Sequence, residues 1–393
     1  MRILIVNRMI GTLLGGGETF DLGVARNLAK MGHEVVVVTA KPLFSRSRLS
    51  YPDLNVIYLP TIDLRPLEAK SRRFSQILGT VFRYADNYIF ERIVFSWISR
   101  HSNYSKYDIV QCCSMTWLPK WIATHLKIPV VTWLPGPPSR LAQRLLRTIV
   151  SYPHVGLFCH GDPVKILENQ LGFVRGVDFE IIEPGIDFEL VKEYTRQRNN
   201  IRAELGLSSD TVVGVTVARL IPVKNHHFLI EGIEQAVYEL EAPIVWFFVG
   251  DGPERPFLER VTKAKNLQDR VRWLGQMPQN EVHRILAASD IFALTSVYEN
   301  FSIATLEAMA YGLPIVATEV GYLREIVKES GGGILIRVGD IKGLAKAIAG
   351  LASDTNYRRQ LGENGRAYAR HFAWPNIIAK LLQFYEQVMS GDP

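Results

Sequence analysis

The sequence predicts an α/β protein made of two doubly wound parallel-sheet domains that face each other across a cleft. Three observations support this fold class. The chain has 393 residues, which suits two domains of about 200 residues better than a single core. Its apolar runs are short and rich in Val and Ile, as in strands buried on both faces, and helical patterns separate them. This alternation restarts halfway along the chain, so each half predicts a Rossmann-like domain.

The predicted elements place residues 1–188 in the first domain and residues 189–374 in the second. The first crossover helix follows a run of three glycines and ends at Gly32. The last helix, within residues 375–393, has an apolar face, and spacing alone leaves open which domain this face covers. The predicted strands lie near residues 2–7, 34–39, 55–59, 108–112, 129–133, 155–159 and 179–182, and near residues 211–218, 243–249, 270–274, 290–294, 314–317 and 333–336.

The composition is that of a soluble globular enzyme or binding protein, with 47% hydrophobic and 21% charged residues. The three cysteines form no C-x-x-C motif and no disulfide framework, which favours a reducing compartment. No apolar stretch approaches the roughly 18 residues of a membrane-spanning helix. The segment after Met1 is too short for the core of a signal peptide. We therefore expect a cytoplasmic protein that does not cross a membrane.

Positive charge is concentrated in the first half of the chain. The net charge of the whole chain is +6, whereas residues 41–147 contain 16 basic and 6 acidic residues. Within this stretch, Ser139 is expected to cap a helix on which Arg140, Arg144 and Arg147 share one face. A solvated basic face would explain the pattern. Contact with anionic lipid headgroups or an anionic acceptor would also explain it, and would place the protein peripherally on the inner face of a membrane. Two further basic segments of the same stretch are SRSR (45–48) and KSRRF (70–74).

The stretch SVYENFSIATLEAMAYGLPIVAT (296–318) predicts a loop and a following helix that each carry a carboxylate. Ser302 is the candidate N-cap, and Glu307 lies about 40° around the helix from Ile303, on the face that otherwise packs. A buried carboxylate is costly unless it is hydrogen-bonded. Sugar hydroxyls could bind Glu307, the N–H groups of the helix start could bind phosphates, and Glu299 in the loop could bind further hydroxyls. A nucleotide-sugar fits this order, although an exposed Glu299 and a Glu307 paired with Lys or Arg would fit the pattern equally.

Two basic residues follow the first predicted strand of the second domain. Arg219 comes directly after the strand that ends at Ala218, at the edge where open α/β sheets bind ligands. Lys224 directly precedes a helix, where a cation opposes the helix dipole unless an anion is shared between them. The two residues are therefore a candidate clamp for a diphosphate, and two solvated surface charges are the alternative.

Two glycine-rich loops also follow predicted strands. In VGDGPE, Gly250 and its neighbours either let a ligand approach or form a tight turn, and the turn is the favoured interpretation. In GGGETF, Gly16 and Gly17 lie between the first strand and the first helix, as in loops that contact phosphate. The spacing G-x-G-x-x-G is absent, however, and the second strand ends at Lys41 rather than at an acid. These two departures disfavour a dehydrogenase that binds NAD.

No motif for a metal site is present. His226 and His227 are adjacent in the sequence, so they cannot chelate an ion from one face of a helix. We therefore expect no metal and no other cofactor, and no feature predicts a nucleic-acid partner.

Taken in order along the chain, these segments resemble the family 4 glycosyltransferases of the GT-B fold. The similar segments cover nearly the whole chain, and the second half is the more specific part. The resemblance implies transfer of a glycosyl unit from a nucleotide-sugar, with retention of anomeric configuration and without a catalytic metal. It also implies that the last helix packs back on the first domain. The similar segments are the glycine loop with Glu18, YDIVQ, GID, VARLIPVK, VGDGPE, VRWLGQMP, ASDIFALTSVYENFSIATLEAMAYGLPIVAT and HFAWPNIIAKLLQFYEQV.

The resemblance also implies roles for individual residues. Glu299 and the backbone that follows it would hold the donor sugar and phosphates, and Glu307 would bind the ribose hydroxyls. Arg219 and Lys224 would neutralise the departing diphosphate, as electrostatic catalysis requires. The catalytic candidates are Arg219, Lys224 and Glu299. The donor-binding candidates are Gly16, Gly17, Gly250, Asn300, Phe301, Ser302, Ile303 and Glu307.

The first half departs from the family pattern. Trp133 and the residues after it stand where many relatives carry a histidine, and Gln111 stands where a histidine is common. Pro184 replaces the usual asparagine, and in the second half Asn300 and Ser302 stand where glycines are frequent. The sequence therefore assigns no catalytic histidine.

The leading hypothesis is a retaining glycosyltransferase that moves a hexose from a UDP- or GDP-sugar to a glycolipid or polysaccharide acceptor. One alternative is a sugar-nucleotide epimerase of the same fold, which would convert its donor without an acceptor. Another alternative is a non-catalytic protein of this fold that binds nucleotide or carbohydrate. The sequence does not specify the base, the sugar or the acceptor.

Overall fold

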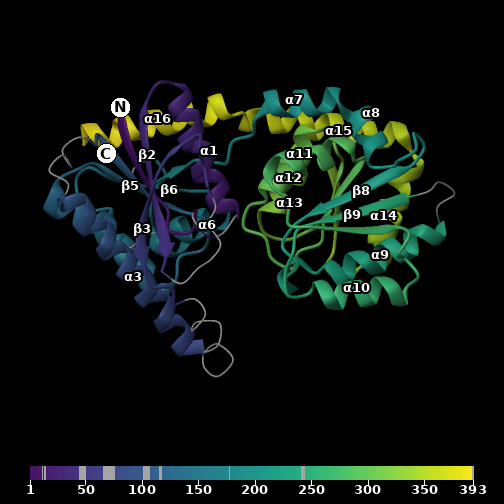
Figure 1. Ribbon diagram of the computed structural model, residues 1–393, viewed down its shortest axis with the longest axis horizontal. Helices are drawn as coiled ribbons and strands as arrows, with labels where there is room; N and C mark the ends of the chain where they lie inside the picture. The colour runs from purple at the N-terminus through teal and green to yellow at the C-terminus, as the bar shows by residue number, and fades with distance from the viewer. Residues whose placement is uncertain are drawn as a thin grey trace. The chain divides into compact units, whose positions relative to one another are not determined.

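The computed structural model describes the chain except for residues 11, 13–14, 44–49, 65–75, 101–106, 115–116, 177, 240–243 and 392–393. The chain forms two compact units, shown in Figure 1. Unit 1 consists of Met1–Gly185 and Trp374–Pro393, and unit 2 consists of Ile186–Ala373. The position of one unit relative to the other is not determined, and the cleft expected between them stays a prediction.

Unit 1 is built on a seven-stranded parallel sheet with the strand order β3-β2-β1-β4-β5-β6-β7. The chain leaves β1 on one side to form β2 and β3, and returns beside β1 to form β4, so the order reverses between β1 and β4. This is the doubly wound arrangement that the sequence predicts. The strands are β1 (Arg2–Val6), β2 (Glu34–Pro42), β3 (Asn55–Thr61), β4 (Ile109–Cys113), β5 (Val130–Leu134), β6 (Val155–Cys159) and β7 (Glu180–Ile181).

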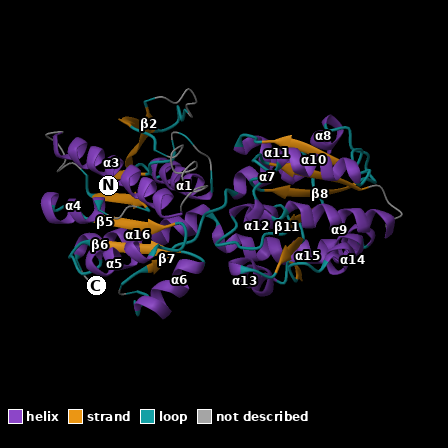
Figure 2. Cartoon of the chain, turned by 90° about the horizontal axis from the view of Figure 1, so that it is seen from below, coloured by secondary structure: helices purple, strands orange, loops and turns teal. Residues whose placement is uncertain are grey.

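Helices cover both faces of this sheet (Figure 2). Alternate residues of β1 show why: Ile3 and Ile5 pack in one core with residues of α1 and α16, whereas Leu4 and Val6 pack in a second core with residues of α3. Both faces are therefore apolar, as the Val- and Ile-rich strands predict. The helices are α1 (Gly16–Lys30), α3 (Gln76–Arg100), α4 (Leu118–Trp121), α5 (Arg140–Ile149), α6 (Asp162–Ile166) and α16 (Trp374–Ser390), with single π-helical turns at Ile122–Leu126 and Leu167–Leu171.

The last helix, α16, belongs to unit 1. Its first residue, Trp374, fits against two glycines, since a Cβ atom at Gly23 or Gly185 would lie 2.0 or 2.3 Å from the Trp374 ring. Near its other end, Tyr385 donates a hydrogen bond to Gln111 Oε1 at 2.5 Å. The apolar face of α16 therefore covers the first domain, a choice that spacing alone left open. The buried apolar residues of α16 are Trp374, Ile377, Ile378, Leu381, Phe384, Tyr385 and Val388.

Unit 2 is built on a six-stranded parallel sheet with the strand order β10-β9-β8-β11-β12-β13. Here the order reverses between β8 and β11. Together with unit 1, this sheet confirms the predicted class of two Rossmann-like doubly wound domains. The strands are β8 (Val212–Val217), β9 (Ile244–Val249), β10 (Val271–Gly275), β11 (Ile291–Leu294), β12 (Ile315–Thr318) and β13 (Gly333–Ile336).

The sheet of unit 2 is also buried on both faces. Val245 and Phe247 of β9 pack in a core with residues of α11, α12 and α13, and Trp246 and Phe248 pack in a core with residues of α9 and α14. The helices of unit 2 are α7 (Phe188–Arg196), α8 (Arg198–Glu204), α9 (His226–Glu239), α10 (Arg255–Ala264), α11 (Gln279–Ala288), α12 (Ile303–Ala310), α13 (Gly321–Ser330), α14 (Ile341–Ser353) and α15 (Thr355–Ala369), with short 3₁₀ turns at Pro222–Lys224 and Arg370–Phe372.

The unit boundary differs by a few residues from the boundary expected at residue 188. Ile186 forms a bridge with Ala373, and its N–H donates to the Phe372 carbonyl at 2.7 Å. These contacts tie residues 186–188 to unit 2 rather than to the first sheet. A sequence pattern does not reveal this pairing, because its two partners lie far apart in the chain.

Candidate active site

The candidate site lies at the carboxyl edge of the sheet of unit 2, beside the point where the strand order reverses. The loops after β8 and β11 leave neighbouring strands toward opposite sides. Open α/β sheets bind ligands in the crevice that such loops leave. Arg219 and Lys224 lie in the loop after β8, and Glu299 lies in the loop after β11. The fold thus brings the three predicted catalytic residues to one edge of one sheet.

Lys224 and Glu299 form an ion pair in which Lys224 Nζ contacts Glu299 Oε2. Ser296 Oγ donates to the same carboxylate oxygen at 3.2 Å. Glu299 is 9% exposed, so it is not the solvated loop carboxylate that the sequence left as an alternative. Lys224 lies just before α9, and Glu299 supplies the anion that a cation beside a helix start requires.

The loop that carries Glu299 is fixed at two points. Val297 N–H donates to the Val223 carbonyl at 2.9 Å, which joins this loop to the segment that carries Lys224. On the other side, Gly321 opens α13 with φ +47°, and a Cβ atom there would lie 1.8 Å from the Glu299 carbonyl oxygen. Only glycine permits such a close approach of backbone to backbone. The protein itself therefore holds Glu299 in place.

The helix between the two glutamates is α12, and it begins where the sequence predicts. Ser302 is its N-cap and accepts a hydrogen bond from Thr305 N–H at 3.2 Å. The helix start provides backbone N–H groups and a partial positive charge next to Asn300 and Ile303. Phe301 is buried in the core of unit 2, so its backbone rather than its ring borders the helix start. The start of α12 therefore has the backbone N–H groups and the partial positive charge that a phosphate site needs.

Glu307 lies inside α12 and is 7% exposed. Burial raises the pKa of its carboxyl group to about 7, and a hydrogen bond from Gln279 acts in the opposite direction. Gln279 Nε2 donates to Glu307 Oε1 at 2.6 Å. Within the described part of the chain Glu307 pairs with no Lys or Arg, which was the alternative from the sequence. One amide donor leaves most of the acceptor capacity of the carboxylate for hydroxyl groups.

Arg219 offers the site an exposed cation. No residue that the structure describes forms a hydrogen bond or ion pair with its guanidinium group. Its backbone is fixed, because His226 Nε2 donates to the Arg219 carbonyl at 3.0 Å. Burial lowers the pKa of His226 to about 4, so this imidazole is neutral near pH 7. A fixed backbone and an unengaged side chain suit a residue that binds an anion.

The glycines of VGDGPE are explained by backbone packing. Gly250 has φ +129°, and a Cβ atom there would lie 2.0 Å from the Ala218 carbonyl oxygen. A Cβ atom at Gly252 would lie 2.3 Å from the Leu220 carbonyl oxygen. The loop therefore lies against the segment that contains Arg219, in agreement with the structural interpretation that the sequence favoured. A role of Gly250 in donor binding stays a prediction.

Two of the predicted donor-binding residues are not in this unit. Gly16 and Gly17 open α1 of unit 1, after Gly15 as the N-cap. A Cβ atom at Gly17 would make only ordinary contacts, 3.7 Å from Pro135 and 3.8 Å from Trp133. Packing within unit 1 thus does not require glycine at this position. The role of Gly16 and Gly17 in donor binding stays a prediction.

Unit 1 contains a buried polar network that the sequence did not reveal. Asp21 of α1 is fully buried and accepts hydrogen bonds from Asn7 at 2.6 Å, from Gln111 at 2.6 Å and from Trp133 at 3.0 Å. Burial raises the pKa of Asp21 to about 7, and the three hydrogen bonds oppose this effect. Two residues that depart from the family pattern, Gln111 and Trp133, are therefore partners of a structural carboxylate. The available signal was an Asp on the apolar face of a predicted helix.

The predicted basic helix is present as α5. Ser139 caps it and accepts from Ala142 N–H at 3.2 Å. Arg140, Arg144 and Arg147 are all exposed, as either a solvated face or a contact surface requires. The two other basic segments, residues 45–48 and 70–74, lie outside the described residues.

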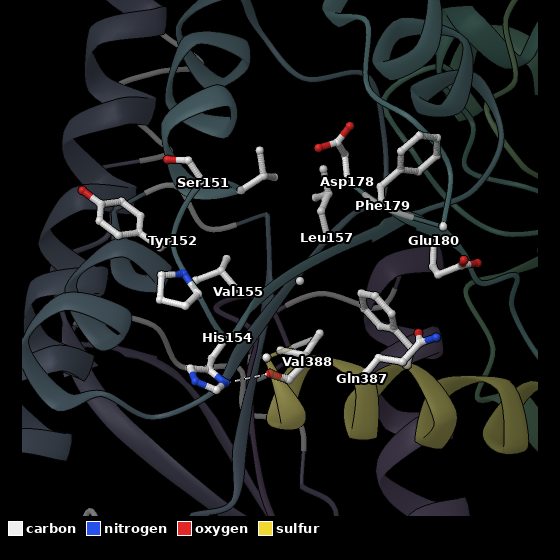
Figure 3. A pocket seen from close by; sticks show the side chains of 16 residues that line it. Ser151, Tyr152, His154, Val155, Leu157, Asp178, Phe179, Glu180, Gln387 and Val388 are labelled. Carbon is white, nitrogen blue, oxygen red and sulfur yellow. Dashed lines mark hydrogen bonds between the residues drawn. The ribbon is translucent and has the colours of Figure 1, made fainter. Parts of the chain in front are cut away.

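Unit 1 also has a cavity of about 320 Å³ at the amino end of β6. Figure 3 shows that His154, Glu180 and Gln387 line it, and that His154 Nδ1 lies 3.1 Å from the Val388 carbonyl oxygen. None of the predicted catalytic or donor-binding residues lines this cavity. It lies at the edge of the sheet opposite the carboxyl ends of the strands, where doubly wound folds bind their ligands.

The described residues contain no group of three or more His, Cys, Asp or Glu side chains placed to hold a metal ion. No described helix combines the length and the apolar character needed to cross a membrane. That the reaction needs no metal stays a prediction from the resemblance.

Residues 197–368 match the model of the family described as glycosyl transferases group 1. This segment of the chain is therefore similar to the group 1 glycosyl transferases. It covers nearly all of unit 2 and contains Arg219, Lys224, Glu299 and Glu307. The resemblance found in the sequence is thus confirmed at the level of this group, whereas membership of family 4 and retention of configuration stay predictions.

Known proteins agree with this assignment. The chain is similar to N-acetyl-alpha-D-glucosaminyl L-malate synthase of Bacillus anthracis, with 29% identity over 221 residues, or 54% of this chain and 57% of that protein. The chain spans only about half the length of the curated relatives that it matches. Its fold is similar to that of sucrose-phosphate synthase from Thermosynechococcus elongatus, with a TM-score of 0.73, 20% identity and 100% coverage of both chains. It is also similar to Anabaena HepE in complex with UDP and glucose, with a TM-score of 0.71, 20% identity and 98% coverage of both chains. These structural similarities confirm the GT-B fold.

Proposed function

We propose that this protein is a retaining glycosyltransferase that moves a hexose from a UDP- or GDP-sugar to a glycolipid or polysaccharide acceptor without a metal ion. The observation that carries the proposal is the arrangement of charge beside β8 and β11. An exposed Arg219 and the Lys224–Glu299 ion pair lie in the loops that flank the strand reversal. The start of α12 and the buried Glu307 follow. This order of cations, helix start and carboxylate matches the order of diphosphate and ribose in a nucleotide-sugar.

Each of these groups has a role in the proposed reaction. The reaction breaks the bond between the anomeric carbon and the phosphate oxygen, so negative charge develops on the departing diphosphate. Arg219 and Lys224 stabilise that charge more strongly in the transition state than in the bound donor. The ion pair with Glu299 holds Lys224 in position before the donor binds. The acceptor hydroxyl gives its proton to the departing phosphate oxygen and forms the new bond on the face that the diphosphate leaves, which gives retention.

A nucleotide-sugar donor is supported by the similar proteins. HepE has been solved in complexes with UDP and with UDP-glucose, and the relative from Bacillus anthracis is named N-acetyl-alpha-D-glucosaminyl L-malate synthase. We propose the same class of donor here. The base and the sugar differ among relatives, so both UDP- and GDP-sugars are included.

The acceptor is proposed from the charge of unit 1. The exposed Arg140, Arg144 and Arg147 of α5 give this unit a basic helix face. Such a face suits an anionic lipid headgroup or an acidic saccharide, and a peripheral position on the cytoplasmic face of a membrane. A lipid-linked or saccharide acceptor follows from this proposal.

The first experiment is a thermal-shift screen of the full chain against UDP, GDP and their sugars. A ligand at a hundredfold excess over its Kd stabilises the folded protein by about 2.7 kcal/mol. The stabilising donor is then incubated with lipid and saccharide acceptors, and the anomeric configuration of the product is measured by NMR. Conversion of the donor without an acceptor would identify an epimerase instead, and stabilisation by no nucleotide would refute the proposal. Loss of activity in EDTA would refute metal independence.

A further inference from the structure

The side chain of Gln279, the first residue of α11, contacts the Glu307 carboxylate. Its amide nitrogen Nε2 lies 2.6 Å from Glu307 Oε1 and 3.5 Å from His283 Nε2, one turn further along the same helix. Glu307 is 7% exposed, whereas the Gln279 side chain is at the surface. Gln279 therefore connects a buried carboxylate to the edge where a ligand would enter. Neither Gln279 nor His283 was among the residues singled out from the sequence.

The hydrogen bonds around His283 set the orientation of this amide. His283 Nδ1 lies 3.0 Å from the Tyr311 hydroxyl oxygen, and its ring stacks on Tyr194 with centroids 6.2 Å apart and an angle of 9°. Burial lowers the pKa of His283 to about 4, so the ring is neutral near pH 7 and has one donor and one acceptor nitrogen. When Nε2 accepts from the Gln279 amide, Nδ1–H donates to Tyr311. The Gln279 NH₂ group then faces both His283 and Glu307.

We propose that Gln279, held in orientation by His283, positions the Glu307 carboxylate to accept the two hydroxyls of a ribose, and so makes the site selective for ribonucleotides. This inference rests on the proposed function, because it assigns Glu307 to the donor nucleotide. Gln279 is a positioning residue in this proposal, since it acts through Glu307. One N–H from Gln279 fixes the carboxylate plane, and the remaining lone pairs accept the hydroxyl donors.

The same geometry predicts a pH dependence of nucleotide binding. A carboxylate that accepts two hydroxyl donors must be ionised, and burial raises the pKa of Glu307 to about 7 while the Gln279 hydrogen bond lowers it. The titratable groups that face this cluster are His283 of α11, Tyr311 at the end of α12, and Tyr194 of α7. Asp187, just before α7, also influences His283 and Tyr311, and Glu193 of α7 influences Tyr311. Their shifts leave His283 and Tyr311 neutral near pH 7, so Glu307 is the member of the cluster that titrates there.

The test compares Gln279→Leu with wild type by calorimetric titration of UDP, GDP and their 2′,3′-dideoxy forms between pH 6 and pH 8.5. Loss of a hydrogen bond to a charged group predicts an affinity for the ribonucleotide that is about tenfold lower. The affinity for the dideoxynucleotide should change by less than about twofold, because the diol that Glu307 recognises is already absent. The midpoint of the pH dependence should move upward in the variant. The matched control is Asn280→Ala, at the adjacent exposed position of the same helix turn.

A second variant separates orientation from packing. His283→Phe keeps an aromatic ring against Tyr194 but removes the acceptor for the Gln279 amide, and should lower ribonucleotide affinity in the same direction by a smaller factor. An equal loss of affinity for ribo- and dideoxynucleotides, or an unchanged pH midpoint in Gln279→Leu, would overturn the positioning role. If wild-type protein binds neither UDP nor GDP, the proposed function itself fails. If only the positioning role fails, the wild type still binds ribonucleotides. Gln279→Leu then discriminates ribonucleotides from dideoxynucleotides as well as the wild type does.

Discussion

Both units bury carboxylates near the point where their strand order reverses, yet these carboxylates have different surroundings. In unit 1, Asp21 accepts hydrogen bonds from three side chains of the same unit. In unit 2, Glu307 accepts from one amide, and Glu299 contacts one lysine and one serine. Burial is similar in the three cases, since all are less than 10% exposed.

The comparison teaches that burial alone does not mark a ligand site. A carboxylate with three internal donors has little capacity left for a ligand, and its role is to hold the fold together. A buried carboxylate with one or two donors retains acceptor capacity for hydroxyl groups. The number of donors that the protein itself supplies therefore separates the structural carboxylate of unit 1 from the candidate ligand carboxylates of unit 2.

The largest expected effect concerns Lys224. Lys224→Ala removes a preorganised cation from the departing diphosphate and should lower kcat for sugar transfer by on the order of 10²–10³. Lys192→Ala is the matched control, because Lys192 is a surface residue whose nearest acidic partner is Glu189 at 4.0 Å. Steady-state transfer assays measure both variants. Near-normal turnover in Lys224→Ala would show that the Lys224–Glu299 ion pair stabilises the fold, as the Asp21 network does, and does not assist transfer.

The second prediction sets Asp21→Ala against Glu307→Ala in urea unfolding. Asp21→Ala leaves three buried donors without an acceptor and should lower the free energy of unfolding by about 3 kcal/mol or more. Glu307→Ala frees a single surface amide and should lower it by less than about 1 kcal/mol while it weakens nucleotide binding. A larger loss of stability in Glu307→Ala than in Asp21→Ala would reverse the distinction drawn between the two units.

The third prediction concerns the link between the network of unit 1 and the last helix. Tyr385→Phe removes the hydrogen bond to Gln111 without a change in ring packing, and should lower the free energy of unfolding by about 1 kcal/mol. Tyr357→Phe, at an exposed position of α15, is the control and should be neutral. Hydrogen exchange of α16 provides the local measurement. Unchanged protection of α16 would mean that apolar packing alone holds this helix.

Features that depend on local spacing were predicted from the sequence, whereas contacts between distant residues were not. The phase of α12 placed Glu307 on its packed face and Ser302 at its N-cap, since both depend only on helical spacing. The Lys224–Glu299 pair was not predicted as a pair, although both residues were selected. They are 75 positions apart, and the strand order rather than any local pattern makes them neighbours.

Long-range contacts also account for what the sequence missed. Gln279 lies at an exposed position, where residue type carries little structural information, and its partner Glu307 belongs to another helix. The buried network of Asp21 draws donors from a loop and two strands. The departures at Gln111 and Trp133 left no catalytic histidine to assign from the sequence, and the structure shows that both side chains are internal partners of one carboxylate.

The smallest expected effect tests whether unit 1 has a surface role in addition to its structural carboxylate. A triple Arg140→Ala, Arg144→Ala, Arg147→Ala variant should fold with nearly unchanged stability, because all three side chains are exposed. Its flotation with anionic liposomes should fall by about 1 kcal/mol of binding free energy per arginine, and the difference should disappear at high salt. Turnover of a water-soluble acceptor should not change. Equal flotation of variant and wild type would mean that the basic face of α5 is only solvated, and acceptor recognition by unit 1 would then have to be sought elsewhere on its surface.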